Sequence, residues 1–271
     1  MKRLTKRTLF LRSMNITFEK YQGAGNDFVL IDNRGGDVAL TTAQIALLCD
    51  RHFGIGADGL MLLQKHEDAD FEMVYFNADG NESTMCGNGG RCIAAYAYKL
   101  GAAEKQMNFM AVDGMHFAVI KDHNAVALQM QDVAEIEFGD GYEILNTGSP
   151  HYIQWVPSVA AIDVFNEGRN IRNKEAFQPK GINVNFVNRN GNGLVIRTYE
   201  RGVEDETLAC GTGVTAAAIV SVGEQTGVFQ IPVKAKGGDL FVSFEKTSKQ
   251  TAENIILTGD AKFVFSGNIM L

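Results

Sequence analysis

A duplicated segment of eight residues is the feature of this sequence that most constrains its fold. ESTMCGNG at residues 82–89 and ETLACGTG at residues 206–213 share the pattern E-[ST]-x-x-C-G-x-G, with Cys86 and Cys210 at equivalent places. Each copy follows a segment of strand character and leads into a helical run that is apolar on every side. A helix that is apolar all round must be buried on all sides. The repeat therefore predicts two similar halves, each a sheet wrapped around one central helix.

Short segments in which apolar and polar residues alternate dominate the chain, and Gly, Asn or Asp bounds each of them, as is typical of strands. Helical patterns are fewer and cover residues 42–51, 89–100, 213–225 and, more weakly, 158–169. The polar segments 121–124 and 190–193 separate neighbouring strands and predict hairpin turns. Because strands and helices do not alternate regularly, the pattern predicts an α+β fold and not a doubly wound parallel sheet.

The repeat also predicts how the chain is divided. We expect residues 14–132 to form an N-terminal half with Cys86 and residues 133–261 a C-terminal half with Cys210, the two being pseudo-symmetric. Each half would be a mixed barrel-like sheet around a buried helix. Residues 262–271 are expected to form a C-terminal strand that returns to the N-terminal half. Residues 1–13, with five basic and no acidic residues, read as a disordered extension upstream of a truer start at Met14.

Charge and hydropathy exclude several classes of protein. The chain carries 25 Lys and Arg against 32 Asp and Glu, and the basic residues gathered in 1–13 make the rest more acidic still. A body this acidic is a poor candidate for binding nucleic acid or anionic membranes. No stretch approaches the ~18 apolar residues of a membrane-spanning helix, and the apolar run at residues 9–11 is too short for a signal peptide. We therefore expect a cytoplasmic protein that binds neither nucleic acid nor a membrane.

The chain has four cysteines, at uneven spacings and without a C-x-x-C pair, so we expect reduced thiols. Cys86 and Cys210 each stand at the start of a helical run and precede Gly-x-Gly. A helix N-terminus carries partial positive charge and unpaired N–H groups, which favours a thiolate and also binds a carboxylate. Two such units facing each other would place one sulfur on each face of a bound carboxylate substrate.

That arrangement suits inversion at a carbon next to a carboxylate. Inversion needs one group that removes a proton and a second, in the opposite protonation state, that returns one to the other face. Each preorganised donor at the carboxylate would contribute roughly 3–4 kcal/mol to stabilising the charge that develops, and the paired thiols would titrate as a coupled unit. The alternatives are that the cysteines are small buried hydrophobes or a redox-sensing pair.

Two segments then identify a family resemblance. Residues 77–91 (NADGNESTMCGNGGR) and 200–213 (ERGVEDETLACGTG) resemble the two signature segments of diaminopimelate epimerases. Further matches, in the same order along the chain, are GAGNDF at 23–28, RHFGIGADG at 51–59, Pro-His at 150–151 and GINVNF at 181–186. The resemblance runs from about residue 16 to the C-terminus.

The resemblance implies a cofactor-independent, two-base interconversion of LL- and meso-diaminopimelate, which serves lysine and cell-wall synthesis in bacteria. It implies no cofactor, no metal and a homodimer. It also implies that Cys86 and Cys210 are the acid/base thiols, that His151 assists Cys86, and that Glu200 assists Cys210. The residues that would hold the substrate are Asn26, Asn77, Gly87, Asn88, Asn183, Glu200, Arg201, Gly211 and Thr212. Of these, backbone N–H groups at both helix starts would hold the reacting carboxylate, and Arg201 the distal one.

The sequence departs from the family pattern at two places and leaves alternatives open. Ser149 stands where members often carry Asn, and Gly59 where some carry Gln. A proline or hydroxyproline racemase shares the two-thiol logic, although Asn88 favours diaminopimelate because a proline racemase more often has His there. A phenazine-type isomerase shares the fold but need not keep both cysteines.

Two further features receive structural interpretations. GIGADG at residues 54–59 spells G-x-G-x-x-G but follows a helical pattern and precedes a strand, so we do not expect a dinucleotide site. Arg91, one turn into its helix, is expected to be a structural ion-pair partner.

Overall fold

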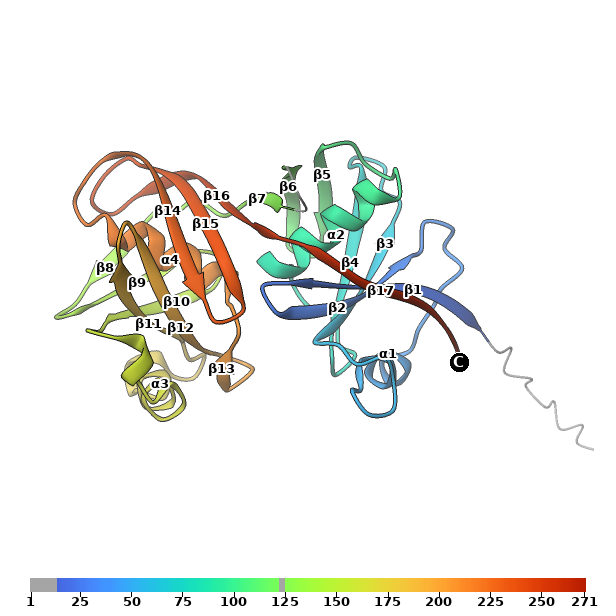
Figure 1. The fold of residues 1–271 in the computed structure, drawn as a ribbon, viewed down its shortest axis with the longest axis horizontal. Helices are drawn as coiled ribbons and strands as arrows, with labels where there is room; N and C mark the ends of the chain where they lie inside the picture. Colours follow the sequence, from blue (N-terminus) through green and yellow to red (C-terminus); the bar gives the residue numbers. More distant parts are fainter. Residues whose placement is uncertain (1–13, 122–124) are drawn as a thin grey trace, which may run out of the picture.

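Seventeen strands form one continuous sheet that curls around two helices in the computed structural model, which describes residues 14–121 and 125–271 (Figure 1). The predicted extension 1–13 and most of the predicted turn 121–124 lie outside the described residues. The strands divide into two lobes, and each lobe holds one of the two helices (Figure 1).

The first lobe pairs β1 to β7 in chain order, and the six successive pairings are antiparallel, parallel, antiparallel, parallel, antiparallel and antiparallel. Short helix α1 connects β2 to β3, and α2 connects β4 to β5. The elements are β1 (Asn15–Gly23), β2 (Asn26–Asp32), α1 (Thr42–Cys49), β3 (Gly59–Gln64), β4 (Phe71–Asn77), α2 (Gly87–Lys99), β5 (Gln106–Ala111), β6 (Gly114–Ile120) and β7 (Ala125–Gln129).

The second lobe repeats this order of elements and of pairings. Its elements are β9 (Tyr142–Asn146), β10 (Pro150–Trp155), α3 (Val164–Arg172), β11 (Asn183–Asn190), β12 (Gly193–Glu200), α4 (Gly211–Ser221), β14 (Gly227–Ala235), β15 (Gly238–Lys246) and β16 (Ala252–Asp260). Short strands β8 (Ile136–Phe138) and β13 (Asp205–Thr207) are additions, which pair with β9 and β12. The identical order confirms the predicted α+β fold of two similar halves.

Two strands near the C-terminus join the lobes. β16 pairs with β15 of its own lobe and with β7 of the other. The last strand, β17 (Lys262–Met270), then crosses to the first lobe and pairs antiparallel with β1 (Figure 1). Because of these crossings, the lobes share one sheet, and the predicted division at residues 132 and 261 stays a prediction.

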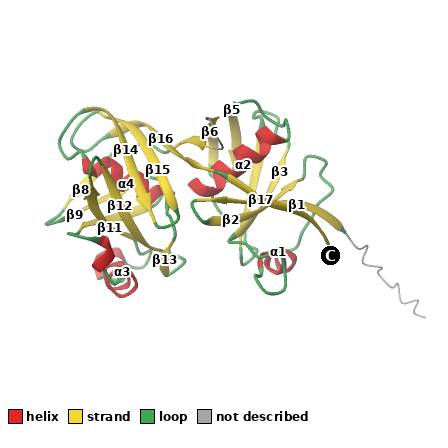
Figure 2. Ribbon diagram, in the orientation of Figure 1, coloured by secondary structure: helices red, strands yellow, loops and turns green. Residues whose placement is uncertain are grey.

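Both central helices are buried, as their apolar sequences predict, and Figure 2 shows each of them in red inside a wall of strands. Every residue of α4 is buried except Thr212. α2 is buried from Gly87 to Ala94 and emerges only at its end, where Tyr98 and Lys99 are exposed. No helix in the described part of the chain is long and apolar enough to span a membrane.

The helix boundaries differ from the predicted ones in an informative way. α2 and α4 each begin two residues earlier than predicted, directly after the cysteine, because Cys86 and Cys210 are the N-caps. The weak helical pattern at residues 158–169 splits into a 3₁₀ turn at Val159–Ala161 and helix α3, whose N-cap is Asp163. The predicted hairpin at residues 190–193 is confirmed, since Asn190 pairs with Gly193.

Candidate active site

The starts of the two central helices meet backbone to backbone. Cys86 caps α2, and its Sγ accepts a hydrogen bond from the Gly89 N–H at 3.2 Å. Cys210 caps α4 at the equivalent position. A Cβ placed on Gly211 would lie 3.4 Å from the Cα of Gly87, so the first turns of the two helices are in direct contact. Free N–H groups of both first turns are thereby brought together with two thiols.

Burial reverses the expected ionisation of the thiols. We expected the helix N-termini to favour the thiolate, but burial raises the pKa of Cys86 to about 11 and that of Cys210 to about 12. Hydrogen bonds from Gly89 to Cys86 and from Thr212 to Cys210 offset only part of this effect. Both sulfurs are therefore held as thiols at neutral pH in this arrangement, and each needs a neighbouring group to take its proton.

His151 lies in a hydrogen-bonded chain that ends at Cys210. Its Nε2 lies 2.8 Å from Thr212 Oγ1, which in turn lies 3.3 Å from Cys210 Sγ. Asn185 Nδ2 lies 3.1 Å from His151 Nδ1, and Asn185 Oδ1 accepts from the hydroxyl of Thr198 at 2.9 Å. Since an amide nitrogen only donates, Nδ1 must be the acceptor and Nε2 carries the proton. Nε2–H then donates to Thr212, which leaves the hydroxyl hydrogen of Thr212 free to face the sulfur.

The protonation of His151 makes the stability of the protein sensitive to acid. The side chain is fully buried (0% exposed), and burial, with Arg201 nearby, lowers its pKa to about 3. Between pH 6.5 and 3 the folded protein therefore binds fewer protons than the unfolded chain, so stability is present above pH 6.5 and is lost as the pH falls. We expect the free energy of urea unfolding to fall less steeply over this range in His151→Gln than in the wild type. Parallel curves for the two proteins would contradict the buried neutral imidazole.

Glu200 ends β12 and acts electrostatically on both thiols. Burial raises the pKa of its carboxyl group, and the negative charge of Asp58 adds to the effect. Its own charge raises the pKa of Cys86 and of Cys210. A buried carboxyl group that interacts electrostatically with both thiols is suited to exchanging protons with them. Among residues 14–121 and 125–271, no hydrogen bond joins His151 to Cys86, so the predicted assignment of His151 to Cys86 and of Glu200 to Cys210 stays a prediction.

Asn183, Arg201 and Ser149 form a polar cluster on the second lobe. Asn183 Nδ2 donates to Ser149 Oγ at 2.8 Å, and its Oδ1 accepts from the backbone N–H of Arg201 at 2.9 Å. The guanidinium of Arg201 also reaches Ser149 Oγ, at 3.3 Å. Within the described residues Arg201 has no carboxylate partner, so its guanidinium is available to a ligand carboxylate. Ser149 is thus hydrogen-bonded to both predicted substrate-binding side chains, those of Asn183 and Arg201.

Asn26 and Asn77 lie at the same end of strands β2 and β4, on either side of the start of β3. Asn26 begins β2, and its Nδ2 donates to Asp58 Oδ2 at 2.5 Å. Asp58 is held in turn by Arg51, at 2.7 Å. Asn77 ends β4 and is exposed, and its side chain makes no hydrogen bond to another described residue. Asn26 also lies 3.4 Å from Nδ2 of Asn88, at the start of α2, and the predicted contact of Asn77 with substrate stays a prediction.

The residues that the sequence reasoning missed are those that hold the site residues in place. Asn185 and Thr198 orient His151, and Asp58 orients Asn26. Thr147 donates to the carbonyl oxygen of Thr212 at 2.8 Å. One signal was available, since Asn183 and Asn185 alternate along β11 and so must face the same side of the sheet.

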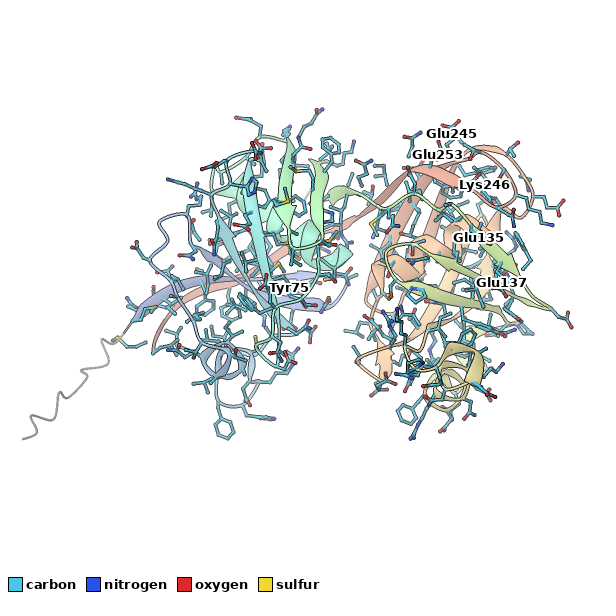
Figure 3. The ribbon with its side chains drawn as sticks, turned by 180° about the vertical axis from the view of Figure 1, so that it is seen from behind. Tyr75, Glu135, Glu137, Glu245, Lys246 and Glu253 are labelled. Carbon is cyan, nitrogen blue, oxygen red and sulfur yellow. The ribbon has the colours of Figure 1, made fainter. Side chains whose placement is uncertain are left out.

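The ring of Tyr75 fills the space beside Gly59. A Cβ on Gly59 would lie 2.6 Å from both the carbonyl oxygen of Phe76 and a ring carbon of Tyr75. Figure 3 labels Tyr75 on the first lobe. The packing around residue 59 therefore leaves no room for a side chain.

We expect Gly59→Gln to destabilise the fold because the new side chain meets both a backbone oxygen and a buried ring. Overpacking of this kind costs about 1–3 kcal/mol, which urea unfolding monitored by circular dichroism would measure. Gly35→Ala is the matched control, because its Cβ meets only the end of the Asp37 side chain. Equal stability of the two variants would show that the site has room for Gln after all.

The G-x-G-x-x-G segment follows helix α1 and leads into strand β3, as the sequence pattern predicts. A dinucleotide fingerprint would instead open a helix.

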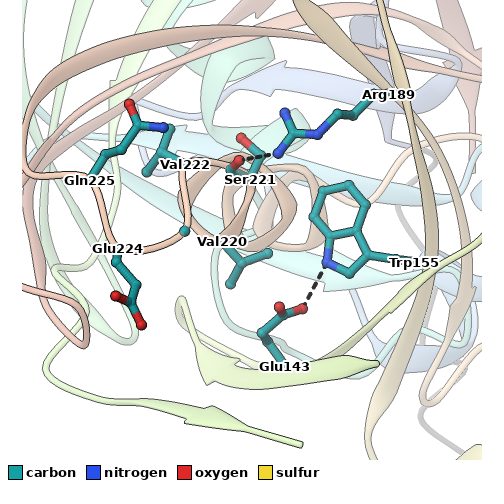
Figure 4. Close-up of a pocket in the computed structure, with 9 residues that line it drawn as sticks. Glu143, Trp155, Arg189, Val220, Ser221, Val222, Glu224 and Gln225 are labelled. Carbon is teal, nitrogen blue, oxygen red and sulfur yellow. Dashed lines mark hydrogen bonds between the residues drawn. The ribbon is translucent and has the colours of Figure 1, made fainter. Parts of the chain in front are cut away.

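A hollow of about 620 Å³ lies at the opposite end of α4 from Cys210 (Figure 4). There Arg189 donates to the carbonyl oxygen of Ser221, and Trp155 donates to Glu143 at 2.9 Å (Figure 4). The hollow lies at the C-terminal end of α4, whereas Cys210 caps the N-terminal end, so the hollow is separate from the site of the two thiols.

Comparison with known proteins agrees with the geometry. The family model described as diaminopimelate epimerase matches residues 18–136 and 144–264. A diaminopimelate epimerase of Flavobacterium psychrophilum is 49% identical over 92% of this chain and 98% of its own length. A second, from Chlorobaculum tepidum, is 44% identical over 92% of this chain and 99% of its own length.

Similar solved structures support the fold. A Bacillus anthracis phenazine biosynthesis protein of the PhzF family has a TM-score of 0.73 at 15% identity, covering 95% of this chain and 100% of that one. A probable proline racemase from Agrobacterium radiobacter has a TM-score of 0.65 at 14% identity, covering 94% of this chain and 92% of that one. At such identities the likeness is one of fold alone, whereas the family match and the relatives at 49% and 44% identity span most of the chain. The chain belongs to the diaminopimelate epimerase family.

Proposed function

We propose that this chain interconverts LL- and meso-diaminopimelate by moving protons between the α-carbon and two thiols, without a cofactor. The observation that carries the proposal is the contact between two helix N-termini, at Gly87 and Gly211, each capped by a cysteine. Membership of the diaminopimelate epimerase family supports the substrate.

The chemistry follows from what each group can do. The carboxylate of the reacting carbon accepts hydrogen bonds from N–H groups at the starts of α2 and α4, which stabilise the negative charge that develops when the α-proton leaves. One sulfur, as thiolate, takes that proton and becomes a thiol. The other sulfur, as thiol, gives its proton to the opposite face and becomes a thiolate. The two sulfurs thus exchange protonation states in each turnover, and the reverse reaction restores them.

Either sulfur must first lose its proton, and the carboxylate of Glu200 is a buried group that can accept it. We keep the assignment of His151 to Cys86 and of Glu200 to Cys210 as the proposal. The contact of His151 with Thr212 supports a place for the imidazole beside the start of α4, which contacts the start of α2. Because burial keeps the imidazole neutral with its proton on Nε2, His151 would assist Cys86 by donating from Nε2 to the thiolate, and for this Nε2 would have to exchange its bond to Thr212 for one to that sulfur.

A double-mutant cycle separates the two assignments, because groups that act as a unit give non-additive losses. The measured quantity is the residual exchange of the α-proton with solvent. We expect His151→Asn to add little to the loss in Cys86→Ser and to add its full loss in Cys210→Ser. The reverse result would assign His151 to Cys210 instead.

Distal recognition would fall to the second lobe. Arg201 would pair with the distal carboxylate, with Asn183 and Ser149 beside it, and Asn26 and Asn77 would contact the substrate from the first lobe. Arg201 suits this role because its planar fork binds a carboxylate through two hydrogen bonds. Proline has no second carboxylate to use such a group, so this cluster favours diaminopimelate over proline.

Proton NMR in D2O tests the substrate. Purified reduced protein would be given meso-diaminopimelate in one tube and L-proline in another. We expect the α-proton signal to disappear from diaminopimelate alone. Exchange on proline alone would move the chain to the racemase reaction. No exchange in either tube, with folded protein, would contradict the proposed activity and leave a thiol redox function as the explanation of the cysteine pair.

We further propose that the enzyme is a cytoplasmic homodimer. Among the described residues, β17 pairs with β1 alone, and it exposes Phe263, Val264, Phe265 and Met270. An exposed apolar edge strand is a surface on which another chain pairs. We expect light scattering to give twice the chain mass, and Val264→Lys to shift the distribution towards monomer. A wild-type monomer at micromolar concentration would contradict this assembly.

A further inference from the structure

Arg91, in the second turn of α2, is a buried cation whose hydrogen-bond partners are all neutral. Its side chain is 0% exposed. Nη1 donates to the carbonyl oxygen of Gly87 at 3.0 Å, Nη2 donates to Oδ1 of Asn88 at 2.8 Å, and Nε has no hydrogen-bond partner in the described part of the chain. No carboxylate of the described residues forms an ion pair with it, so the expectation that it is an ion-pair partner is wrong. Asp260, whose charge acts on it, is paired with Lys262 at 2.7 Å.

An unpaired buried charge is costly, of the order of several kcal/mol, so fold stability alone does not account for Arg91. The chain nevertheless makes room for it. A Cβ on Gly23, at the end of β1, would lie 3.5 Å from Nη2, and one on Gly259, in β16, would lie 3.2 Å from Nε. The guanidinium therefore sits where the first lobe, the crossing strand β16 and the start of α2 meet.

The bond from Arg91 determines which way the amide of Asn88 points. Because Oδ1 of Asn88 accepts from Arg91, its Nδ2 must face the other side. There it donates to the carbonyl oxygen of Ala209 at 3.0 Å and to Oδ1 of Asn26 at 3.4 Å. Ala209 directly precedes Cys210, so this amide links the first turn of α2 to the N-cap of α4. It also completes the orientation of Asn26, whose nitrogen faces Asp58.

We propose that Arg91 is a positioning residue for the two-thiol site: its guanidinium orients Asn88, which holds the two cysteine-capped helix starts in register. The inference rests on the proposed function. In a two-base reaction both sulfurs must face one carbon from opposite sides, and a displacement of 1 Å costs about 100-fold in rate. A lysine could not replace the fork, because a single ammonium cannot serve both acceptors in the same geometry.

The positive charge of Arg91 also acts on the thiol of Cys86. Arg91 lowers the pKa of this thiol, while burial and the charge of Glu200 raise it. The other titratable groups that face Arg91 are Cys92 on the same helix and Asp260 on β16. Cys92 is more deeply buried than Cys86, so we expect the thiolate to form at Cys86 first.

Two variants and one control test the proposal. Arg91→Met removes both the charge and the donors, whereas Arg91→Lys keeps the charge and loses the fork. Arg189→Met is the control, because Arg189 also donates from its guanidinium to a helix carbonyl oxygen, that of Ser221, but it is exposed and lies at the far end of α4. For each protein we would measure the melting temperature, kcat and KM for diaminopimelate per folded site, and the pH dependence of iodoacetamide alkylation of Cys86 by peptide mass spectrometry.

We expect kcat to fall at least about 100-fold in Arg91→Met and substantially in Arg91→Lys, and to stay at the wild-type value in Arg189→Met. Alkylation of Cys86 at pH 8 should slow about tenfold in Arg91→Met, as for one pKa unit, and stay close to wild type in Arg91→Lys. A lower melting temperature with unchanged kcat and alkylation would overturn the proposal. Arg91→Lys keeps the test decisive if Arg91→Met does not fold. Alkylation needs no substrate, so it tests Arg91 even if the wild type does not act on diaminopimelate.

Discussion

Replacing either capping cysteine by serine is expected to lower kcat for epimerisation of diaminopimelate at least about 100-fold, in both directions. Proton transfer by a positioned side chain contributes about 10²–10⁴-fold to a rate, and a serine hydroxyl is far too weak an acid to replace a thiol. Because Cys86 and Cys210 cap equivalent helices that meet at their first turns, neither sulfur can substitute for the other. Coupled measurements of kcat from the LL and meso isomers would show both losses.

Cys49→Ser is the matched control for these two variants. Cys49 is 3% exposed and ends α1, in a separate core cluster from the central helices. We expect this variant to lose stability, since a hydroxyl replaces a thiol in an apolar core, but to keep kcat per folded site. A rate within threefold of wild type in Cys86→Ser or Cys210→Ser would contradict a role for that sulfur in proton transfer.

Gly211→Ala is expected to cause the second large loss of activity, although alanine favours helix over glycine. The added Cβ would lie 3.0 Å from a methyl carbon of Leu257 and 3.4 Å from the Cα of Gly87. Leu257 can turn away, but the backbone at Gly87 can move only with the first turn of α2. The N–H donors survive the substitution, so a loss of kcat of about 100-fold would come from spacing alone.

The measurement is kcat and KM together with the melting temperature, and Gly35→Ala again serves as the control, because its new Cβ meets only the end of the Asp37 side chain. We expect Gly211→Ala to fold with a melting temperature near that of the wild type while its kcat falls. If kcat stayed within threefold of wild type, the close approach of Gly211 to Gly87 would not be a requirement of the reaction.

The meeting of the two helix starts was open to prediction from the sequence. A repeat of eight residues placed before two fully apolar helices implies two equivalent units, and two equivalent units on one sheet tend to pair about an axis between them. The order of strands and helices in the two lobes then follows from the duplication. What the pattern could not reveal was the boundary of each helix, because Gly87 and Gly211 disfavour helix locally and begin one only under a cysteine N-cap.

The protonation states of the site residues and the contacts that hold them in place could not be predicted from the sequence, because both depend on the packed fold. The position of Cys86 at a helix start favours a thiolate. Burial outweighs this effect and raises the pKa of the thiol, and this burial arises only when the sheet folds around α2. The partner of His151 depends on the pairing of β10 with β11, which brings Asn185 beside it. The sequence suggests an ion-pair role for Arg91, and only its burial without a carboxylate partner among the described residues shows that it needs another explanation.

The most direct test of the central claim, that two thiols act on opposite faces of one carbon, is a single passage from one isomer to the other in D2O. LL-diaminopimelate would be incubated until a small fraction had reacted, and both isomers would then be separated and analysed by mass spectrometry. The two-thiol account predicts that the meso product carries deuterium at the inverted carbon while the recovered substrate keeps its proton. Product that retains the original proton would mean that a single group works on both faces, and would contradict the account.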